Sequence, residues 1–274
     1  MDKVETAVKA ALDAGLYVII NIHWEGGWLN HPVDANKEAL DERLEAMWKQ
    51  IALRFRDYDD RLLFAGTNEV NNDDADGAQP TEENYRVQNG FNQVFVNTVR
   101  ATGGRNHYRH LIVQAYNTDV AKAVAHFTMP LDIVQNRIFL ECHYYDPYDF
   151  TIMPNDEDFK SQWGAAFAGG DVSSTGQEAD IEATLGSLNV FINDNVPVII
   201  GEYGPTLRDQ LTGEDRIEII ESRNDYIEYV VKTCVKNKLV PLYWDAGYTE
   251  KLFDRTTGQP HNAASIAAIM EGLN

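Results

Sequence analysis

The sequence predicts a parallel α/β fold of the (β/α)8 (TIM-barrel) type, with six βα units in one domain over residues 1–274. Predicted strands and helices alternate along the whole chain, without a change of composition or a long linker between the halves. Such alternation is typical of βαβ units with right-handed crossovers. At 274 residues and 44% hydrophobic content, the chain can bury one large core, as α/β barrels of this length do.

Six apolar segments of strand length predict the sheet. They cover residues 16–22, 61–67, 110–114, 137–145, 196–201 and 239–244. Short, continuous apolar runs are typical of strands buried on both faces, as in a parallel sheet.

Segments with apolar residues at helical spacing separate these strands. They predict helices over 2–14, 36–56, 82–101, 119–127, 177–193, 216–236 and 261–272. Thr81 and Gly103 are typical signals for the start and the end of the third helix. Residues 146–176 form a polar and aromatic loop that is too long to be only a connector, and we expect it to form part of a binding wall.

The charge balance excludes some partners. With 23 basic and 43 acidic residues the net charge is -20, which opposes binding to nucleic acid or to an anionic membrane surface but not to a neutral polyhydroxylated substrate. No segment approaches 18 consecutive apolar residues, and no basic start followed by an apolar stretch opens the chain, so that the protein is expected either to be made without a signal peptide or to have lost it. Cys142 and Cys234 have no metal-binding spacing and are expected to be small buried residues.

Two predicted strands lead directly into a glutamate. The apolar run from Arg61 ends in Asn68 and Glu69, and the run from Val196 ends in Gly201 and Glu202. Parallel sheets keep their chemistry at the carboxyl ends of their strands. Two carboxylates at such ends are the minimum set for acid/base and nucleophilic chemistry at an acetal carbon.

Other strand ends carry histidine and aromatic residues. His143 and Tyr145 lie on one face of their strand and could orient a carboxylate nucleophile. Alone, a strand-end histidine is more often structural, but two strand-end glutamates reverse that balance. Five aromatic residues also lie at predicted strand ends: Trp24, Trp28, Tyr203, Trp244 and Tyr248. Each alone predicts packing, whereas together they suggest sugar subsites.

No metal or cofactor is predicted. The spacing of His23 and His31 fits no zinc motif, and the acidic runs Asp57–Asp60 and Asn71–Asp76 lack the spacing of a calcium loop and are expected to be solvated. We find neither a phosphate-binding glycine loop nor a nucleophilic serine elbow.

Five strand ends together resemble glycoside hydrolase family 5, and in particular its bacterial endoglucanases (cellulases). The matching segments, in the family's order, are 16–29, 67–69, 143–145, 200–204 and 243–247. The resemblance implies a retaining endo-β-1,4-glucanase that hydrolyses cellulose or related β-glucans by double displacement. A mannanase, a xyloglucanase, a lichenase, or a weakly active chain that only binds glucan remain alternatives.

The resemblance also assigns the site residues. It implies that Glu69 is the general acid/base and Glu202 the nucleophile. The substrate-binding residues that it assigns are Asn68 at the sugar 2-hydroxyl, Tyr145 on the nucleophile, His23 and His143 in the same subsite, and Trp244 as its stacking floor, with Trp24 and Trp28 as further aromatic contacts.

The chain also departs from the family. The strand expected at 16–22 is the family's third of eight, so the first two strands have no counterpart here; nor does an arginine that the family carries beside the nucleophile. Val70 replaces the usual proline. An open barrel would expose two sheet edges, so we expect a homo-oligomer whose copies cover them. The family resemblance also implies a secreted, extracellular protein.

Overall fold

The computed structural model describes residues 1–72, 79–208, 210–211, 215–248 and 251–274. These residues group into two compact units: unit 1 is 1–141 with 195–197, and unit 2 is 142–194 with 198–274. Each unit is described by itself. The single catalytic domain expected over 1–274 stays a prediction, and residues 73–76 of the acidic run lie outside the described residues.

In the described part of the chain, six strands form one sheet in the order β1-β2-β3-β4-β5-β6. Their bounds are β1 Val18–Asn21, β2 Leu62–Ala65, β3 Leu111–Gln114, β4 Ile138–Tyr144, β5 Val198–Tyr203 and β6 Val240–Tyr243. The pairings of β1 with β2, β2 with β3, β3 with β4 and β5 with β6 are all parallel. The predicted α/β class and the six predicted strands are therefore confirmed.

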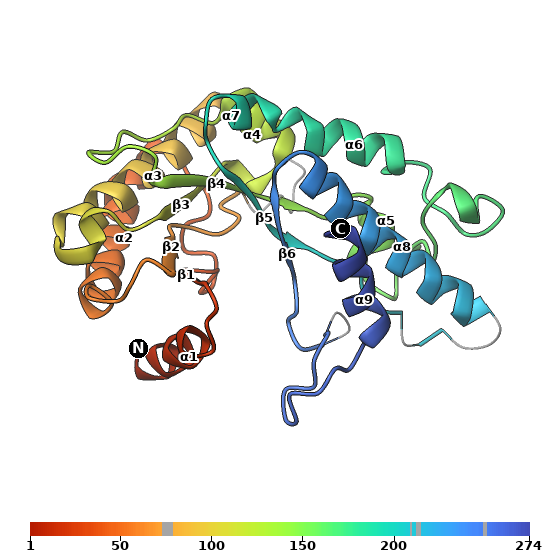
Figure 1. Ribbon diagram of the computed structural model, residues 1–274. Helices are drawn as coiled ribbons and strands as arrows, with labels where there is room; N and C mark the ends of the chain where they lie inside the picture. Colours follow the sequence, from red (N-terminus) through yellow and green to blue (C-terminus); the bar gives the residue numbers. More distant parts are fainter. Residues whose placement is uncertain (73–78, 209, 212–214, 249–250) are drawn as a thin grey trace. The chain divides into compact units, whose positions relative to one another are not determined.

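Unit 1 surrounds its strands with helices that match the predicted ones closely. They are α1 Asp2–Asp13, α2 Asp34–Arg54, α3 Glu82–Ala101 and α4 Val120–His126, with short 3-10 turns η1 Gly104–His107 and η2 Tyr116–Thr118. Helices α2 and α3 pack side by side (Figure 1). Trp48 of α2 fills the space between them and the sheet: its ring lies 5.4 Å from that of Phe64 and 4.6 Å from that of Phe95, and its indole N–H donates to the carbonyl of Gly66.

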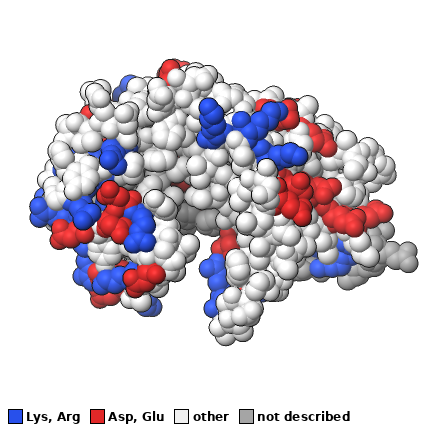
Figure 2. Space-filling model, viewed as in Figure 1, with Lys and Arg blue, Asp and Glu red and all other residues white. Residues whose placement is uncertain are grey.

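Charged side chains of both signs gather on part of the face of unit 1 that Figure 2 shows. Figure 2 shows basic and acidic side chains interspersed around α1 and α2. Arg54 of α2 pairs with Asp2 and Glu5 of α1, and Tyr58 also donates to Glu5. Hydrogen bonds from Tyr58, Arg54 and Lys9 lower the pKa of Glu5 to about 2. These contacts tie α1 to the rest of unit 1.

Unit 2 contains α5 Tyr148–Thr151, η3 Ala165–Phe167, α6 Glu178–Ser187, α7 Asn189–Asn193, α8 Asp215–Lys236 and α9 Ala263–Gly272. Helix α8 packs against both α6 and α9 (Figure 1). The single helix expected over 177–193 is wrong in one respect, because α6 and α7 are separate helices. Gly186 and Ser187, which are weak helix formers, end α6.

The long segment 146–176 is folded against α8. Trp163 is buried, its backbone N–H donates to the hydroxyl of Ser222, and its ring packs on Tyr226 and Tyr229 with centroid distances of 5.3 and 5.6 Å. The indole N–H of Trp163 donates to the carbonyl of Gly176 at 2.7 Å. The segment is thus held at its middle and at its end.

No described helix is both long and apolar enough to cross a membrane.

Candidate active site

In unit 1, a buried amide organises the chain around Glu69. Gln114, at the end of β3, accepts hydrogen bonds from the backbone N–H of Glu69 at 3.2 Å and from the hydroxyl of Thr67 at 3.3 Å, and it donates to Glu141 at 2.9 Å. Glu69 has a left-handed backbone with φ of 47°, which is uncommon outside glycine. Asn68 is buried beside it. The structure therefore brings Asn68 and Glu69 together at a rigidly supported turn after β2.

The other predicted site residues of unit 1 follow β1. His23 is half-buried, and its ring lies within hydrogen-bond distance of Asn21, at 3.3 Å. Trp24 is 59% exposed and so offers its ring to a ligand. Trp28 is partly buried against the core of unit 1, and the Arg43 guanidinium lies 4.3 Å from its ring centre. The packing of Trp28 is structural, and its role as a sugar contact stays a prediction.

In unit 2, Glu202 is the centre of a small polar cluster. It is the last but one residue of β5, which runs two residues further than predicted, and its side chain is nearly buried. The hydroxyl of Tyr145 donates to Oε2 of Glu202 at 2.9 Å, and Nδ1 of His143 lies 3.6 Å from the same oxygen. A charge-assisted hydrogen bond of this kind fixes the direction of the carboxylate. The cluster therefore holds the carboxylate of Glu202 nearly buried and in a fixed direction, as the predicted role of nucleophile requires.

Trp244 follows β6 and is held through its backbone, which donates to the carbonyl of Tyr203 at 2.9 Å. Tyr203 packs edge-on against Tyr243, and burial raises the pKa of Tyr203. Beneath them, the buried guanidinium of Arg223 donates to the hydroxyl of Tyr243, to the carbonyl of Pro205 and to the hydroxyl of Ser265. Arg223 thus joins the chain after β5 to β6 and α9.

The sequence analysis did not predict the supporting roles of Gln114 and Arg223. Gln114 gave a signal, since it is a polar residue at the end of an apolar strand, like Asn68. Arg223 gave none, because an arginine within a predicted helix is normally solvent-exposed.

A parallel α/β sheet with carboxylates at the ends of β2 and β5 defines a class of enzyme that works at the carboxyl ends of barrel strands. Residues 1–250 match the family model of cellulase (glycosyl hydrolase family 5), and the chain belongs to this family. The predicted (β/α)8-type fold is confirmed by its solved relatives, described next.

Curated and solved relatives extend over the whole chain. It is 94% identical over 274 residues to a xyloglucan-specific endo-β-1,4-glucanase of Bacteroides ovatus, and 33% identical over 299 aligned residues to endoglucanase A of Paenibacillus barcinonensis. A solved Bacteroides ovatus family 5 xyloglucanase in complex with a XXXG heptasaccharide superposes with a TM-score of 0.98 at 94% identity. A family 5 xyloglucanase from Paenibacillus pabuli, at 34% identity, gives a TM-score of 0.91.

The lengths differ. All of this chain is covered in these four comparisons, but it spans 55% of the Bacteroides ovatus glucanase and 59% of its solved chain. It spans 72% of the Paenibacillus barcinonensis enzyme and 80% of the Paenibacillus pabuli chain.

Proposed function

We propose that the chain acts as a retaining endo-β-1,4-glucanase whose preferred substrate is xyloglucan. The observation that carries this proposal is the 94% identity, over all 274 residues, to a xyloglucan-specific endo-β-1,4-glucanase. The cluster around Glu202 supports it, since a retaining glycosidase needs a carboxylate held ready for attack.

The proposed reaction has two steps. Glu202 attacks the anomeric carbon and forms a covalent glycosyl-enzyme, while Glu69 gives its proton to the departing sugar oxygen. Glu69 then removes a proton from water, and the water oxygen attacks the same carbon and releases Glu202. Two inversions leave the configuration of that carbon unchanged. Asn68, His23, His143 and Trp244 are proposed to hold the sugar.

Hydrolysis assays with variants test this function. Wild type should release reducing ends from xyloglucan faster than from mixed-linkage β-glucan, carboxymethylcellulose or mannan. Glu69→Gln should lower kcat by about 10²- to 10⁴-fold, the range for a general acid. Glu202→Gln should lose nearly all activity, because no nucleophile remains.

The matched control is Glu182→Gln, which neutralises an exposed carboxylate on α6 and should leave the rates unchanged. Proton NMR should show the β-anomer as the first product. Equal rates for wild type and both site variants would contradict the residue roles. A chain that binds glucans without cleaving any of the four would instead be the glucan-binding alternative.

We also propose that copies of the chain associate. Among the described residues, β1 has one neighbouring strand, β2, and Leu16 and Tyr17 just before it are 57% and 75% exposed. An unpaired strand edge beside exposed apolar side chains is a surface that a second copy can cover. Light scattering after size-exclusion chromatography should give a multiple of the chain mass; a monomer would contradict this.

Secretion is proposed as well, because a polymeric glucan cannot enter a cell intact. Fractionation of the producing cells should then place the protein outside the cytoplasm, whereas recovery only in the cytoplasm would oppose the proposal.

A further inference from the structure

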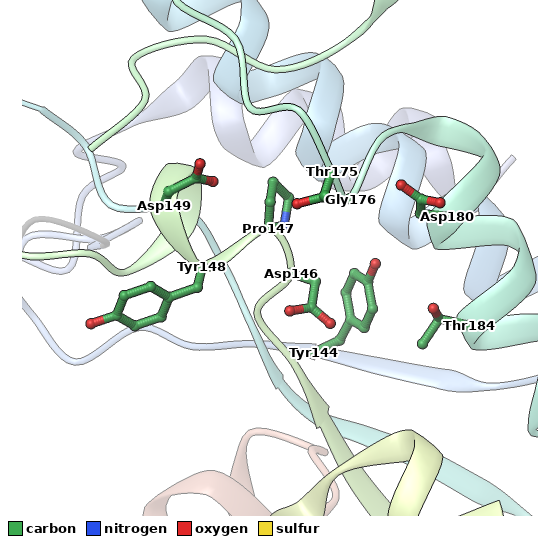
Figure 3. Close-up of a pocket in the computed structure, with 9 residues that line it drawn as sticks. All are labelled: Tyr144, Asp146, Pro147, Tyr148, Asp149, Thr175, Gly176, Asp180 and Thr184. Atoms are coloured by element: carbon green, nitrogen blue, oxygen red, sulfur yellow. The ribbon is translucent and has the colours of Figure 1, made fainter. Parts of the chain in front are cut away.

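Unit 2 contains a pocket that the proposed reaction does not use. Its volume is about 550 Å³, within the range of pockets that hold small ligands. Figure 3 shows its walls, which come from the end of β4, both ends of the segment 146–176, and α6. The residues that matter here are Tyr144, Asp146, Pro147, Thr175, Asp180 and Thr184.

The hydroxyl of Tyr144 points to a missing ligand. Tyr144 is only 2% exposed, and its hydroxyl has no hydrogen-bond partner among the described residues. Buried tyrosine hydroxyls normally have one. In Figure 3 the phenol ring stands between Asp146 on one side and Asp180 and Thr184 of α6 on the other. A ligand in the pocket would supply the absent partner.

The lining selects the chemistry of that ligand. Carboxylates and hydroxyls line the pocket, and Pro147 adds an apolar surface. Its described lining includes no lysine or arginine. Carboxylates accept strong hydrogen bonds from hydroxyl groups. The carboxylates of Asp146, Asp149 and Asp180 do not form a group whose oxygens all lie within 4.8 Å of one another, so the geometry does not suit a single metal ion. From this lining we propose that the pocket binds a neutral saccharide, as a second carbohydrate site.

The walls of the pocket are built rigidly. Gly176 has φ of 67°, and a Cβ there would lie 2.7 Å or less from atoms of Pro147, so the two ends of the segment 146–176 touch. The buried indole of Trp163 holds Gly176 through its carbonyl, and the buried hydroxyl of Tyr226 holds the carbonyl of Asp146. A preformed pocket loses little entropy when a ligand binds.

The pocket and Glu202 lie on opposite sides of one strand end. Tyr145 donates to Glu202, whereas the preceding residue, Tyr144, lines the pocket. Successive side chains of a strand point to opposite faces, so the two neighbours serve different sites. The inference goes beyond the proposed hydrolysis and does not require it.

Calorimetric titration with cellotetraose tests the proposal, in a Glu202→Gln background, in which nearly all turnover should be lost. Two sites per chain are expected. Tyr144→Phe removes a neutral hydrogen bond and should weaken one site by roughly 2- to 10-fold, whereas Asp180→Asn removes a charged one and should weaken the same site by about tenfold or more. Neither variant should change the other site. If the proposed function fails and the site around Glu202 binds no saccharide, the pocket should still bind one cellotetraose. Both pocket variants should weaken that binding to the same extent as before.

Matched controls remove the same groups elsewhere in unit 2. Asp194→Asn removes an exposed carboxylate and Tyr229→Phe a hydroxyl outside the pocket, and neither should change either site. Without ligand, Tyr144→Phe should melt at the same temperature as its parent or higher, because the lost hydroxyl has no partner.

Three results would overturn the proposal. One is cellotetraose binding that neither pocket variant alters. Another is a lower melting temperature of Tyr144→Phe with unchanged saccharide affinity. The third is stabilisation by calcium chloride that Asp180→Asn abolishes and Asp194→Asn does not, since the pocket would then be a cation site.

Discussion

At the scale of single residues, Gln114 is the support on which the turn at Glu69 depends. Replacing it with leucine keeps the volume but removes the acceptor for the Glu69 N–H and the donor to Glu141. Leaving such buried groups without this partner should lower the free energy of unfolding by about 1–3 kcal/mol. We also expect kcat to fall more than KM rises, because Glu69, the proposed proton donor, loses its position.

Urea unfolding and initial rates on xyloglucan measure both effects. Gln50→Leu is the control, because Gln50 is an exposed glutamine of α2 and surface changes cost within about 0.5 kcal/mol. A Gln114→Leu protein with wild-type rates would show that the turn at Glu69 is set by other contacts.

Tyr145 gives a second residue-scale prediction. Tyr145→Phe removes the hydrogen bond to Oε2 of Glu202. Hydrogen bonds to charged groups contribute about 1.5–3 kcal/mol, which corresponds to about 10- to 100-fold in kcat if the bond is fully used in the transition state. Rates on xyloglucan should show this loss. Tyr108→Phe, at an exposed tyrosine, should show none, and an unchanged Tyr145→Phe enzyme would remove Tyr145 from the mechanism.

Some residues of the candidate site could be predicted from the sequence and others could not. The ends of apolar strands predicted Glu69, Glu202, His143 and Tyr145 as site residues, and the structure brings the last three together within unit 2. The unpaired hydroxyl of Tyr144 could not be predicted, because a strand pattern reveals which face a residue takes but not whether its hydroxyl finds a partner.

At the scale of elements, the start of β3 carries a pH-sensitive contact. His110 immediately precedes β3, and its Nε2 lies 2.8 Å from the guanidinium of Arg137, just before β4. Burial, and then the charge of Arg137, lower the pKa of His110 from its ordinary value of 6.5. Asp60 opposes this shift and Arg100 adds to it. The folded protein therefore holds His110 neutral at a pH where the unfolded chain protonates it.

Lowering the pH should destabilise the folded protein through His110. Below pH 6.5 the unfolded chain binds more protons at this position, so stability falls as pH decreases through that value and is fully present above it. His110→Gln should flatten the decline in urea midpoint between about pH 6.5 and 5. His107→Gln, at an exposed histidine, should leave the decline unchanged. An equal slope in both variants would contradict this account.

The elements themselves were largely predictable, with boundaries within about three residues. Apolar runs and helical periodicity sufficed for β1 to β6 and for α1 to α4, α8 and α9. The short α5 and η3 within 146–176 were not predicted. Their positions depend on contacts distant in sequence, such as Trp163 with Ser222, which no local pattern reveals.

At the scale of the whole molecule, the net charge of -20 should make the response to salt depend on the substrate. Carboxymethylcellulose is a polyanion and is repelled, whereas xyloglucan is neutral. Raising NaCl from about 20 to 200 mM shortens the screening length from roughly 20 to 7 Å. We expect kcat/KM on carboxymethylcellulose to rise severalfold and that on xyloglucan to stay constant.

The comparison needs no variant, because the neutral polymer is its own control. Parallel salt responses on both polymers would mean that the net charge does not govern the encounter with substrate.

The fold class could be predicted because alternation of strand and helix is a property of the whole chain and survives errors at single boundaries. Substrate preference could not be predicted, because the strand-end residues fit several β-glucans and we expected it to depend on the long loop 146–176, whose sequence does not reveal which sugar it would contact.

The neighbouring tyrosines at the end of β4 constrain how this protein can change. Gln114 pairs with Glu141, and that register decides which of Tyr144 and Tyr145 faces Glu202. Inserting or deleting one residue in β4 would exchange them, so that Tyr145 would face the pocket and Tyr144 would face Glu202. Only changes of an even number of residues within the strand preserve both orientations.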